Sequence, residues 1–373
     1  MSRPIVITGG GTGGHIFPML AIADALVAHG IEPERLRLVG SRRGQEARLL
    51  GERAYPLTLL PGRGLRRSWH ARAVVENVGA LIGLVNAFGL AVSHLRRWRP
   101  AAVVSLGGYA AAATDTAALV WRSPLVLVDL DAVPGAVHRV LARFARRRLI
   151  PFGETSGRVV VTGVPVRDAI VALDRRPAAR QQARTTLDPP IGPDRVIVVV
   201  MTGSLGSARV NRAVLELAHQ WSKRADLALI HVTGRRDVGW VRAGAPPSSA
   251  LDYRVIEFAD MVQWWAVADA AVCRAGATTI AELGILGIPA VLVPLPGAPG
   301  DHQARNADRV ARAGGAVVLA DVDCDGDHLA EILRPLLDET TRDAMGSAMA
   351  ALGRPRATDD IAQEILALVR EGS

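Results

Sequence analysis

Cysteine is nearly absent from this chain, which has only Cys273 and Cys324 among its 373 residues. Two cysteines cannot build the disulfide framework of a small secreted domain, and their spacing matches no metal site made of paired cysteines. A reducing compartment fits this composition. The fold therefore has to rest on apolar packing, and the length is sufficient for two domains with separate cores.

A targeting segment and a long apolar run are missing as well. Pro4–Thr8 already has the composition of a strand, so we expect no signal peptide before it. The mostly apolar stretch Val74–Val92 is interrupted by Glu76, Asn77 and three glycines, which makes it a poor membrane-spanning helix. Hydrophobic residues make up 49% of the chain, and glycine and proline punctuate it regularly, as in a soluble α/β protein.

Aromatic residues are scarce at 4% of the chain, and it contains no helix-turn-helix, zinc-finger or aromatic–basic motif. Nucleic acid is therefore not an expected partner. Charge is unevenly distributed: Met1–Pro165 carries 21 basic and 10 acidic residues, whereas the remainder carries 23 and 26. A basic first half with apolar helices favours an anionic surface as partner, although a basic patch is equally common as a plain solvated surface.

Arginines flank the apolar stretch 74–92 and recur further along the chain. An apolar surface with an arginine rim can lie on an anionic membrane leaflet, whereas core packing is the simpler explanation for most of its apolar residues. The arginines before the stretch are Arg63, Arg66, Arg67 and Arg72, those after it are Arg96, Arg97 and Arg99, and five more lie between Arg139 and Arg148.

A glycine-rich turn follows the first expected strand, Ile5–Thr8. Residues 9–15 read Gly-Gly-Gly-Thr-Gly-Gly-His, and a helix is expected from about Pro18 to Val27. The glycines also satisfy G-x-G-x-x-G, but the next strand, Leu36–Val39, ends without the acidic residue that binds a ribose in dinucleotide-binding proteins. A dinucleotide cofactor is therefore not expected.

His15 distinguishes this turn from an ordinary glycine-rich loop. A histidine beside several glycines is open to whatever approaches the backbone, and its unperturbed pKa lies near neutrality. It is a candidate general base, and the alternative is a histidine that caps the following helix.

The pattern of strand, glycine turn and helix starts again at Arg195–Met201. Residues 202–207 read Thr-Gly-Ser-Leu-Gly-Ser, and a helix is expected to begin near Arg209. Such a turn at a helix N-terminus offers backbone N–H donors to a diphosphate. The repetition predicts two similar halves.

A third turn lies within the stretch Phe258–Asn306. Ala270–Cys273 is an expected strand, a helix starts at about Thr278, and residues 290–294 form the next strand. A βαβ unit of this kind binds ligands at the carboxyl end of its strand. The helix N-terminus can face an anion there, and Glu282 is placed to accept hydrogen bonds from a sugar hydroxyl.

Two carboxylates follow the expected strand Pro124–Val128. Asp129 and Asp131 stand two residues apart, a spacing that suits metal ligands, acid/base groups or an acceptor-binding pair. The residues alone leave these three possibilities open.

Several of these segments resemble the MurG-type glycosyltransferases, which join N-acetylglucosamine to a lipid-linked muramoyl peptide. The similar segments are GGGTGGHIFPMLAIADAL at residues 9–26, VVVTGVPVR at residues 159–167 and the stretch Phe258–Asn306. The resemblance implies an α/β fold of two Rossmann-like domains facing a cleft, the arrangement called GT-B. It implies a first domain at 1–165 for the acceptor and the membrane, a second at 166–352 for UDP-N-acetylglucosamine, and a C-terminal helix at 353–373 that packs back on the first.

The resemblance also assigns site residues for an inverting transfer. His15 becomes the general base or the partner of one, and Asp129 is a second catalytic group. The acceptor-binding set is Thr12, His15, Tyr109, Asp129 and Asp131, and the donor-binding set is Thr12, Gly13, Gly14, Arg167, Ser204, Leu205, Gly206, Phe258, Ala277, Thr278, Glu282, His302 and Gln303. No cofactor or metal is implied, because loop and helix N–H groups with Arg167 or Arg274 can stabilise the departing UDP.

Two positions depart from the family pattern. Residues 128–131 read Val-Asp-Leu-Asp where the family usually has His-Glu-Gln-Asn, and His302 replaces a glutamine. The acceptor site is therefore expected to differ from that of the family. The resemblance places the protein peripherally on the cytoplasmic side of the cell membrane. Three alternatives stay open: a related transferase with another acceptor, a UDP-N-acetylglucosamine 2-epimerase, and a sugar-nucleotide-binding protein without turnover.

Overall fold

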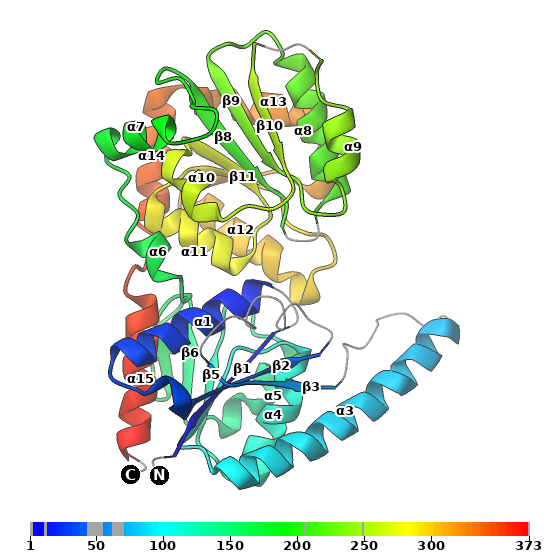
Figure 1. The fold of residues 1–373 in the computed structure, drawn as a ribbon, viewed down its shortest axis with the longest axis vertical. Helices are drawn as coiled ribbons and strands as arrows, with labels where there is room; N and C mark the ends of the chain where they lie inside the picture. Colours follow the sequence, from blue (N-terminus) through cyan, green and yellow to red (C-terminus); the bar gives the residue numbers. More distant parts are fainter. Residues whose placement is uncertain are drawn as a thin grey trace. The chain divides into compact units, whose positions relative to one another are not determined.

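The chain forms two compact units in the computed structural model (Figure 1). Unit 1 is Met1–Arg167 with Arg356–Ser373, and unit 2 is Asp168–Pro355. The structure describes residues 3–10, 13–42, 55–61, 71–203, 206–247 and 250–371, and it describes the backbone but not the side chains of residues 71–82, 109 and 110.

Within the described residues, unit 1 is built on a parallel sheet of seven strands in the order β3-β2-β1-β4-β5-β6-β7. The strands are β1 (Ile5–Thr8), β2 (Leu36–Ser41), β3 (Leu57–Leu60), β4 (Ala102–Ser105), β5 (Leu125–Val128), β6 (Arg147–Ile150) and β7 (Val159–Val161). β1 pairs with β2 and β4, with Ile5 opposite Leu36 and Ala102. All of β1 is buried, as expected for a strand covered by helices on both faces.

Helices cover both faces of the unit 1 sheet (Figure 1). They are α1 (Gly13–Ala28), α3 (Ala71–Trp98), α4 (Tyr109–Val120), α5 (Ala136–Leu141) and α15 (Ala357–Glu371). Val6 belongs to a core cluster that includes residues of α3 and α4. Because side chains alternate along a strand, Ile5 and Ile7 face the other side, where α1 packs against α15.

The chain returns to unit 1 through α15, which follows all of unit 2 in sequence. Thr358 Oγ1 accepts a hydrogen bond from the backbone N–H of Val166 at 3.0 Å and donates one to the Val166 carbonyl at 2.8 Å. Arg147 of β6 also pairs with Glu364 at 3.3 Å. The last helix is therefore fixed to unit 1 by backbone, charge and apolar contacts.

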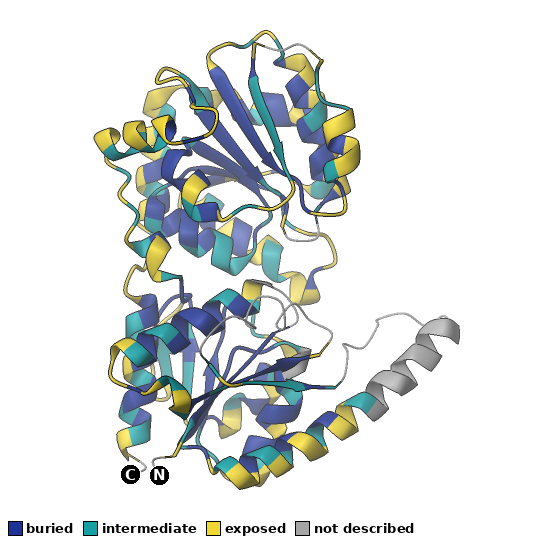
Figure 2. Ribbon diagram, in the orientation of Figure 1, coloured by how far each residue is buried: buried dark blue, intermediate teal, exposed yellow. Residues whose placement is uncertain are grey.

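Unit 2 repeats the architecture, with a described sheet of six parallel strands in the order β10-β9-β8-β11-β12-β13. The strands are β8 (Val196–Met201), β9 (Leu227–Val232), β10 (Asp252–Ile256), β11 (Ala270–Cys273), β12 (Ala290–Leu292) and β13 (Ala316–Val318). The helices are α6 (Asp168–Val171), α7 (Pro177–Thr185), α8 (Ala208–Gln220), α9 (Val238–Ala243), α10 (Met261–Val267), α11 (Ala277–Leu286), α12 (His302–Arg312), α13 (Gly326–Leu333) and α14 (Glu339–Ala350). Val198 and Val200 of β8 pack against α8 and α13 in one core. Figure 2 shows central strands buried along their length beneath helices that expose one side.

Both sheets have a point where the strand order reverses. The order runs outward from β1 through β2 on one side and β4 on the other, and from β8 through β9 and β11 in the same way. The carboxyl ends of the strands at such a point are where open α/β sheets bind ligands. In unit 1 these ends lead into residues 9–10 and 106–108, and in unit 2 into residues 202–207 and 274–276.

The α/β fold class of two Rossmann-like domains is confirmed, because each unit is a parallel sheet with alternating helices. The predicted start of the first helix, at about Pro18, was wrong. α1 begins at Gly13 and contains Pro18, so His15 lies in its first turn. The glycines and Pro18 favour a later start locally, but the packing of α1 against α15 stabilises the earlier one. Across the described residues, none of the helices combines the length and apolar character needed to cross a membrane.

Candidate active site

Two glycine turns meet at the reversal point of unit 1. The N–H of Leu106, after β4, donates to the carbonyl of Thr8 at the end of β1, at 2.8 Å. Gly10 has a φ of 128°, and Gly107 and Gly108 each have a φ of 81°. A Cβ on Gly108 would lie 2.9 Å from the Gly10 carbonyl oxygen. Glycine is therefore required here both by backbone conformation and by the close approach of the turns.

His15 lies over this pair of turns. It is half-buried in the first turn of α1, and a Cβ on Gly108 would lie 3.9 Å from its Nε2. A partly exposed imidazole next to a glycine backbone is a candidate to accept a proton from a hydroxyl group. Gly13 and Gly14 open the same helix, whereas Thr12 lies outside the described residues. Tyr109 is the first residue of α4, and its side chain also lies outside the description.

Asp129 is buried in a network that the sequence did not indicate. Its Oδ1 lies 2.7 Å from His138 Nδ1, and its Oδ2 accepts from Arg148 Nε at 2.7 Å. Burial opposes its ionisation, but the hydrogen bonds and charges of His138 and Arg148 outweigh burial and lower the pKa of Asp129. Both carboxylate oxygens are thus engaged, which favours a role in holding neighbouring groups over direct contact with a substrate proton.

The other two expected residues of unit 1, Asp131 and Arg167, are half-buried. Asp131 is half-buried, two residues after the buried Asp129. Arg167 stacks on Phe17 of α1, with the guanidinium carbon 4.9 Å from the ring centroid. This contact joins the end of the segment 159–167 to the helix that carries His15.

The glycine turn of unit 2 is organised around β8 and α8. Thr202 Oγ1 donates to the carbonyls of Val232 and Thr233 at 3.1 and 3.0 Å. Gly206 has a φ of 78°, and a Cβ there would lie 2.5 Å from the Thr233 carbonyl oxygen. Ser207 caps α8 by accepting from the N–H of Val210. Ser204 and Leu205 lie outside the described residues.

Arg274 brings a positive charge to this turn from the end of β11. Its Nη2 donates to Ser207 Oγ at 2.5 Å, and its Nη1 pairs with Asp321 at 2.7 Å. The guanidinium is mostly buried, so these partners fix it beside the N-terminus of α8. A helix N-terminus and an arginine together favour an anionic group, as in a diphosphate.

The β11–α11 turn carries the expected ribose site. Ala277 and Thr278 open α11 after Gly276, and Glu282 is buried one turn further on. Glu282 Oε2 accepts from the indole N–H of Trp265 at 2.9 Å, a partner that the sequence did not indicate. Phe258 is 52% exposed.

The loop before α12 holds the last expected donor residues. Gln303 Oε1 accepts from the backbone N–H of Leu295 at 2.9 Å, and His302 Nδ1 lies 2.8 Å from the Pro299 carbonyl oxygen. Asn306 Nδ2 donates to the Ala275 carbonyl at 3.2 Å, which ties α12 to the turn after β11. Among the described residues no cluster of three or more histidine, cysteine, aspartate or glutamate side chains could hold a metal ion.

The expected residues that the structure describes therefore lie after strands of each unit's sheet, and their roles stay a prediction. His15, Asp129 and Asp131 follow the strands of unit 1, and Gly206, Thr278 and Glu282 follow those of unit 2. His138, Arg148 and Trp265 were missed, because they hold site residues through contacts that no local pattern indicates. The only signal for Trp265 and His138 was a polar aromatic side chain within a short, mostly apolar helix.

Residues 5–150 match the glycosyltransferase family 28 N-terminal domain, and residues 197–364 match the glycosyltransferase family 28 C-terminal domain. The chain is 36% identical over 383 residues to the UDP-N-acetylglucosamine--N-acetylmuramyl-(pentapeptide) pyrophosphoryl-undecaprenol N-acetylglucosamine transferase of Moorella thermoacetica, covering 99% of the chain and 100% of the relative. It is 37% identical to the protein of the same name from Alkalilimnicola ehrlichii, covering 97% and 98%. A crystal structure of Acinetobacter baumannii MurG superposes with a TM-score of 0.76 at 26% identity, covering 98% of this chain and 100% of that one.

Proposed function

Because this chain belongs to glycosyltransferase family 28, we infer that it transfers N-acetylglucosamine from UDP-N-acetylglucosamine to the lipid-linked N-acetylmuramyl pentapeptide. The observation that carries this conclusion is similarity over nearly the whole chain to relatives that share one printed activity. The chain is thus a glycosyltransferase of peptidoglycan synthesis.

Unit 2 is proposed to bind the UDP-sugar. The turn 202–207, the N-terminus of α8 and Arg274 offer N–H donors and positive charge to the diphosphate. Glu282, held by Trp265, would accept hydrogen bonds from the ribose hydroxyls. Phe258 would cover the base, and the loop held by Gln303 would face the sugar.

Unit 1 is proposed to bind the acceptor and to supply the base. His15 would take the proton of the acceptor hydroxyl while that oxygen forms a bond to the anomeric carbon. The bond from this carbon to UDP breaks, and its electron pair leaves on the phosphate oxygen, where the donors around residues 202–207 stabilise it. Attack in line with the departing group inverts the anomeric centre.

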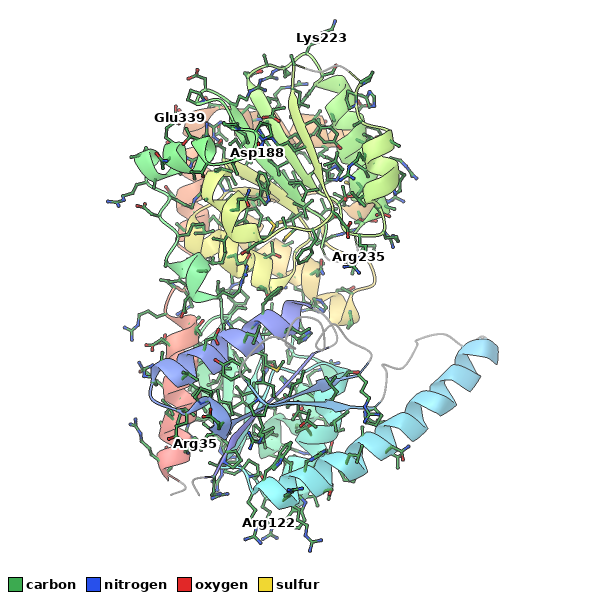
Figure 3. All side chains as sticks on the ribbon, viewed as in Figure 1. Arg35, Arg122, Asp188, Lys223, Arg235 and Glu339 are labelled. Atoms are coloured by element: carbon green, nitrogen blue, oxygen red, sulfur yellow. The ribbon has the colours of Figure 1, made fainter. Side chains whose placement is uncertain are left out.

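We further propose that unit 1 docks on an anionic membrane surface. Val85 and Leu90 of α3, Trp121 after α4, and Val140 and Phe144 near α5 are exposed apolar side chains. Arg96 lies over the Trp121 ring at 6.0 Å, and Arg143 lies over the Phe144 ring at 4.7 Å. Arg122 projects from the same unit (Figure 3). Arg63, Arg66 and Arg67, which the sequence also indicated, lie outside the described residues.

This pairing of exposed apolar groups with arginines suits a surface with buried acyl chains and anionic headgroups. A peripheral position on the cytoplasmic leaflet follows from the proposal, since UDP-N-acetylglucosamine and the lipid-linked acceptor have to reach one enzyme.

The deciding experiment measures UDP release from UDP-N-acetylglucosamine with and without lipid-linked muramoyl pentapeptide. We expect release that depends on this acceptor and a product that carries both sugars. Release with another glycolipid alone would identify a related transferase, for which the sequence at 128–131 gives the reason. Conversion of the sugar without any acceptor would identify an epimerase, and tight UDP binding without turnover would identify a binding protein.

A further inference from the structure

A buried chain of hydrogen bonds lies beneath the Gly107–Gly108 turn of unit 1. Ser105, the last residue of β4, places its Oγ 2.8 Å from Asp115 Oδ2 of α4 and 3.0 Å from His138 Nε2 of α5. All three side chains are at most 3% exposed. Such a degree of burial means that these polar groups must satisfy one another, because water does not reach them.

The chain continues from His138 to a charged pair. His138 Nδ1 lies 2.7 Å from Asp129 Oδ1, and Asp129 Oδ2 accepts from Arg148 Nε at 2.7 Å. Asp129 is ionised, because His138 and Arg148 lower its pKa despite burial. Nδ1 of His138 therefore carries a hydrogen and donates it to Asp129, which leaves Nε2 facing Ser105.

The hydrogen bonds of Ser105 require one further proton in this cluster. A serine hydroxyl donates one hydrogen and accepts two. Ser105 Oγ already accepts from the N–H of Gly107 at 3.2 Å, so it must donate to one of Asp115 and His138 and accept from the other.

One proton meets this requirement in two ways. When it sits on His138 Nε2, His138 donates to Ser105, and Ser105 donates to the Asp115 carboxylate. When it sits on Asp115, the carboxylic acid donates to Ser105, and Ser105 donates to neutral His138. The exchange moves two protons in the same direction along the chain and leaves the total charge of Asp115 and His138 at zero.

Loss of this proton leaves a repulsive contact in a buried place. Ser105 then has a lone pair against either a carboxylate oxygen or an imidazole nitrogen, and the cluster gains a net negative charge. Burial raises the pKa of Asp115 to about 7, and its Oδ1 finds no hydrogen-bond partner among the described residues. Both facts favour a cluster that keeps the proton at neutral pH and gives it up in mild alkali.

The Gly107–Gly108 turn connects this cluster to His15. Gly107 binds the cluster through its N–H, and a Cβ at Gly107 would lie 3.3 Å from the His138 ring. The next residue, Gly108, lies against His15 Nε2 and the Gly10 carbonyl. The backbone that supports the proposed base therefore rests directly on Ser105 and His138.

We propose that Ser105 and His138 are positioning residues of the acceptor site, and that one proton shared between His138 and Asp115 locks the Gly107–Gly108 turn in the place that His15 requires. The proposal assigns Asp129 to this cluster as its fixed negative charge, and it rests on the proposed role of His15. The charged or titratable groups that contact the cluster are Asp115 from α4, Asp129 after β5 and Arg148 from β6, and His15 of α1 lies next to Gly108.

The test compares pH profiles of transfer to lipid-linked muramoyl pentapeptide by the full chain. Wild type should lose kcat as pH rises through the range in which the cluster loses its proton. Ser105→Ala should lower kcat about tenfold at neutral pH, the cost of roughly one buried hydrogen bond, and should flatten this alkaline decline. Asp115→Asn places an amide N–H where the shared proton sits and cannot lose it, so the alkaline decline should disappear there too.

A matched control is Thr114→Val, at the residue before Asp115. Thr114 is buried, and its Oγ1 has no hydrogen-bond partner in the described structure. This variant should keep the wild-type pH profile. Calorimetric UDP affinity should be unchanged in all three variants, because the cluster lies in unit 1. An alkaline decline that persists in both Ser105→Ala and Asp115→Asn would overturn the proposal.

A second measurement separates this proposal from the proposed function. In the wild-type protein, the NMR signal of the Gly107 amide should shift with pH. The midpoint of this shift should equal the midpoint of the alkaline decline in kcat. No shift overturns the shared proton whatever the transfer assay gives. A shift in Gly107 supports the shared proton even if muramoyl lipid proves inert, a result that would overturn the proposed function alone.

Discussion

His15 combines a half-buried imidazole with the glycine backbone of Gly108 next to it. His15→Ala removes the proposed proton acceptor, so turnover should fall by roughly 10²–10⁴-fold, the usual contribution of a positioned base. UDP affinity, measured by calorimetry, should stay the same, because the proposed donor residues of unit 2 remain intact. Near-normal transfer by this variant would remove His15 from the mechanism.

Glu282 is the proposed ribose ligand, and the indole N–H of Trp265 holds its carboxylate. Glu282→Ala should weaken UDP binding by roughly 1–3 kcal/mol, as expected for the loss of a charged hydrogen bond. Trp265→Phe removes the N–H that orients Glu282 Oε2 together with part of a fully buried ring, but it leaves the Glu282 carboxylate in place, so it should weaken binding in the same direction by a smaller amount. Calorimetry on both folded variants measures which of them loses more UDP affinity. Unchanged affinity in Glu282→Ala would refute the ribose assignment.

The sequence indicated His15 and Glu282 because each stands at a fixed distance from a glycine turn. It did not indicate that Asp129 would be buried between His138 and Arg148, since that contact depends on the pairing of β5 with β6 and on the packing of α5. Two carboxylates at a strand end are compatible with several kinds of site. Only the tertiary contacts of each carboxylate distinguish between these kinds of site.

At the scale of elements, the turn between β8 and α8 has no space for a side chain at Gly206. Gly206→Ala would place a Cβ 2.5 Å from the Thr233 carbonyl oxygen at a φ of 78°, so the turn must move. We expect at least tenfold weaker UDP binding, about 1.4 kcal/mol. Gly239→Ala in α9 is the matched control, because a Cβ there meets nothing within 4 Å. Equal affinity in the two variants would contradict a diphosphate site in this turn.

The helix that carries His15 shows why element boundaries are harder to predict than elements. Pro18 is a common first residue of a helix, and the glycines before it lower helix propensity, so the sequence favoured a later start. In the structure α1 begins at Gly13, because its apolar face packs on the sheet and on α15. Tertiary packing outweighs local propensity here.

Electrostatic docking is a property of unit 1 as a whole. Reversal of Arg96, Arg97 and Arg143 to Glu should release the protein from vesicles that contain anionic lipid. Wild-type binding should weaken as salt rises, because exposed charges are screened over about 8–10 Å. Co-sedimentation measures both effects. Each single reversal is compared with Arg235→Glu on unit 2, which changes the charge by the same amount. Equal binding to neutral and anionic vesicles would argue against docking by charge.

His231 and Asp115 should contribute to stability in opposite directions as pH changes. Burial lowers the pKa of His231 in unit 2 to about 3, so folding favours its neutral form, and its stabilising effect is lost as pH falls from 6.5 toward 3. The pKa of Asp115 in unit 1 is raised to about 7, so its contribution is lost as pH rises from 4 toward 7. Thermal unfolding between pH 4 and 8 should show unit 2 losing Tm in acid, and His231→Gln should flatten that slope. A slope unchanged in His231→Gln would refute the assignment.

Unit 1 is discontinuous, and this has a consequence for synthesis in the cell. Residues 168–355 form the whole of unit 2, whereas α15, which covers α1, is made after them. During translation unit 2 can complete its fold while the first 167 residues still lack their final helix. Unit 2 can therefore mature before unit 1, and the apolar surface of α1 that α15 covers stays available to chaperones until α15 has been made.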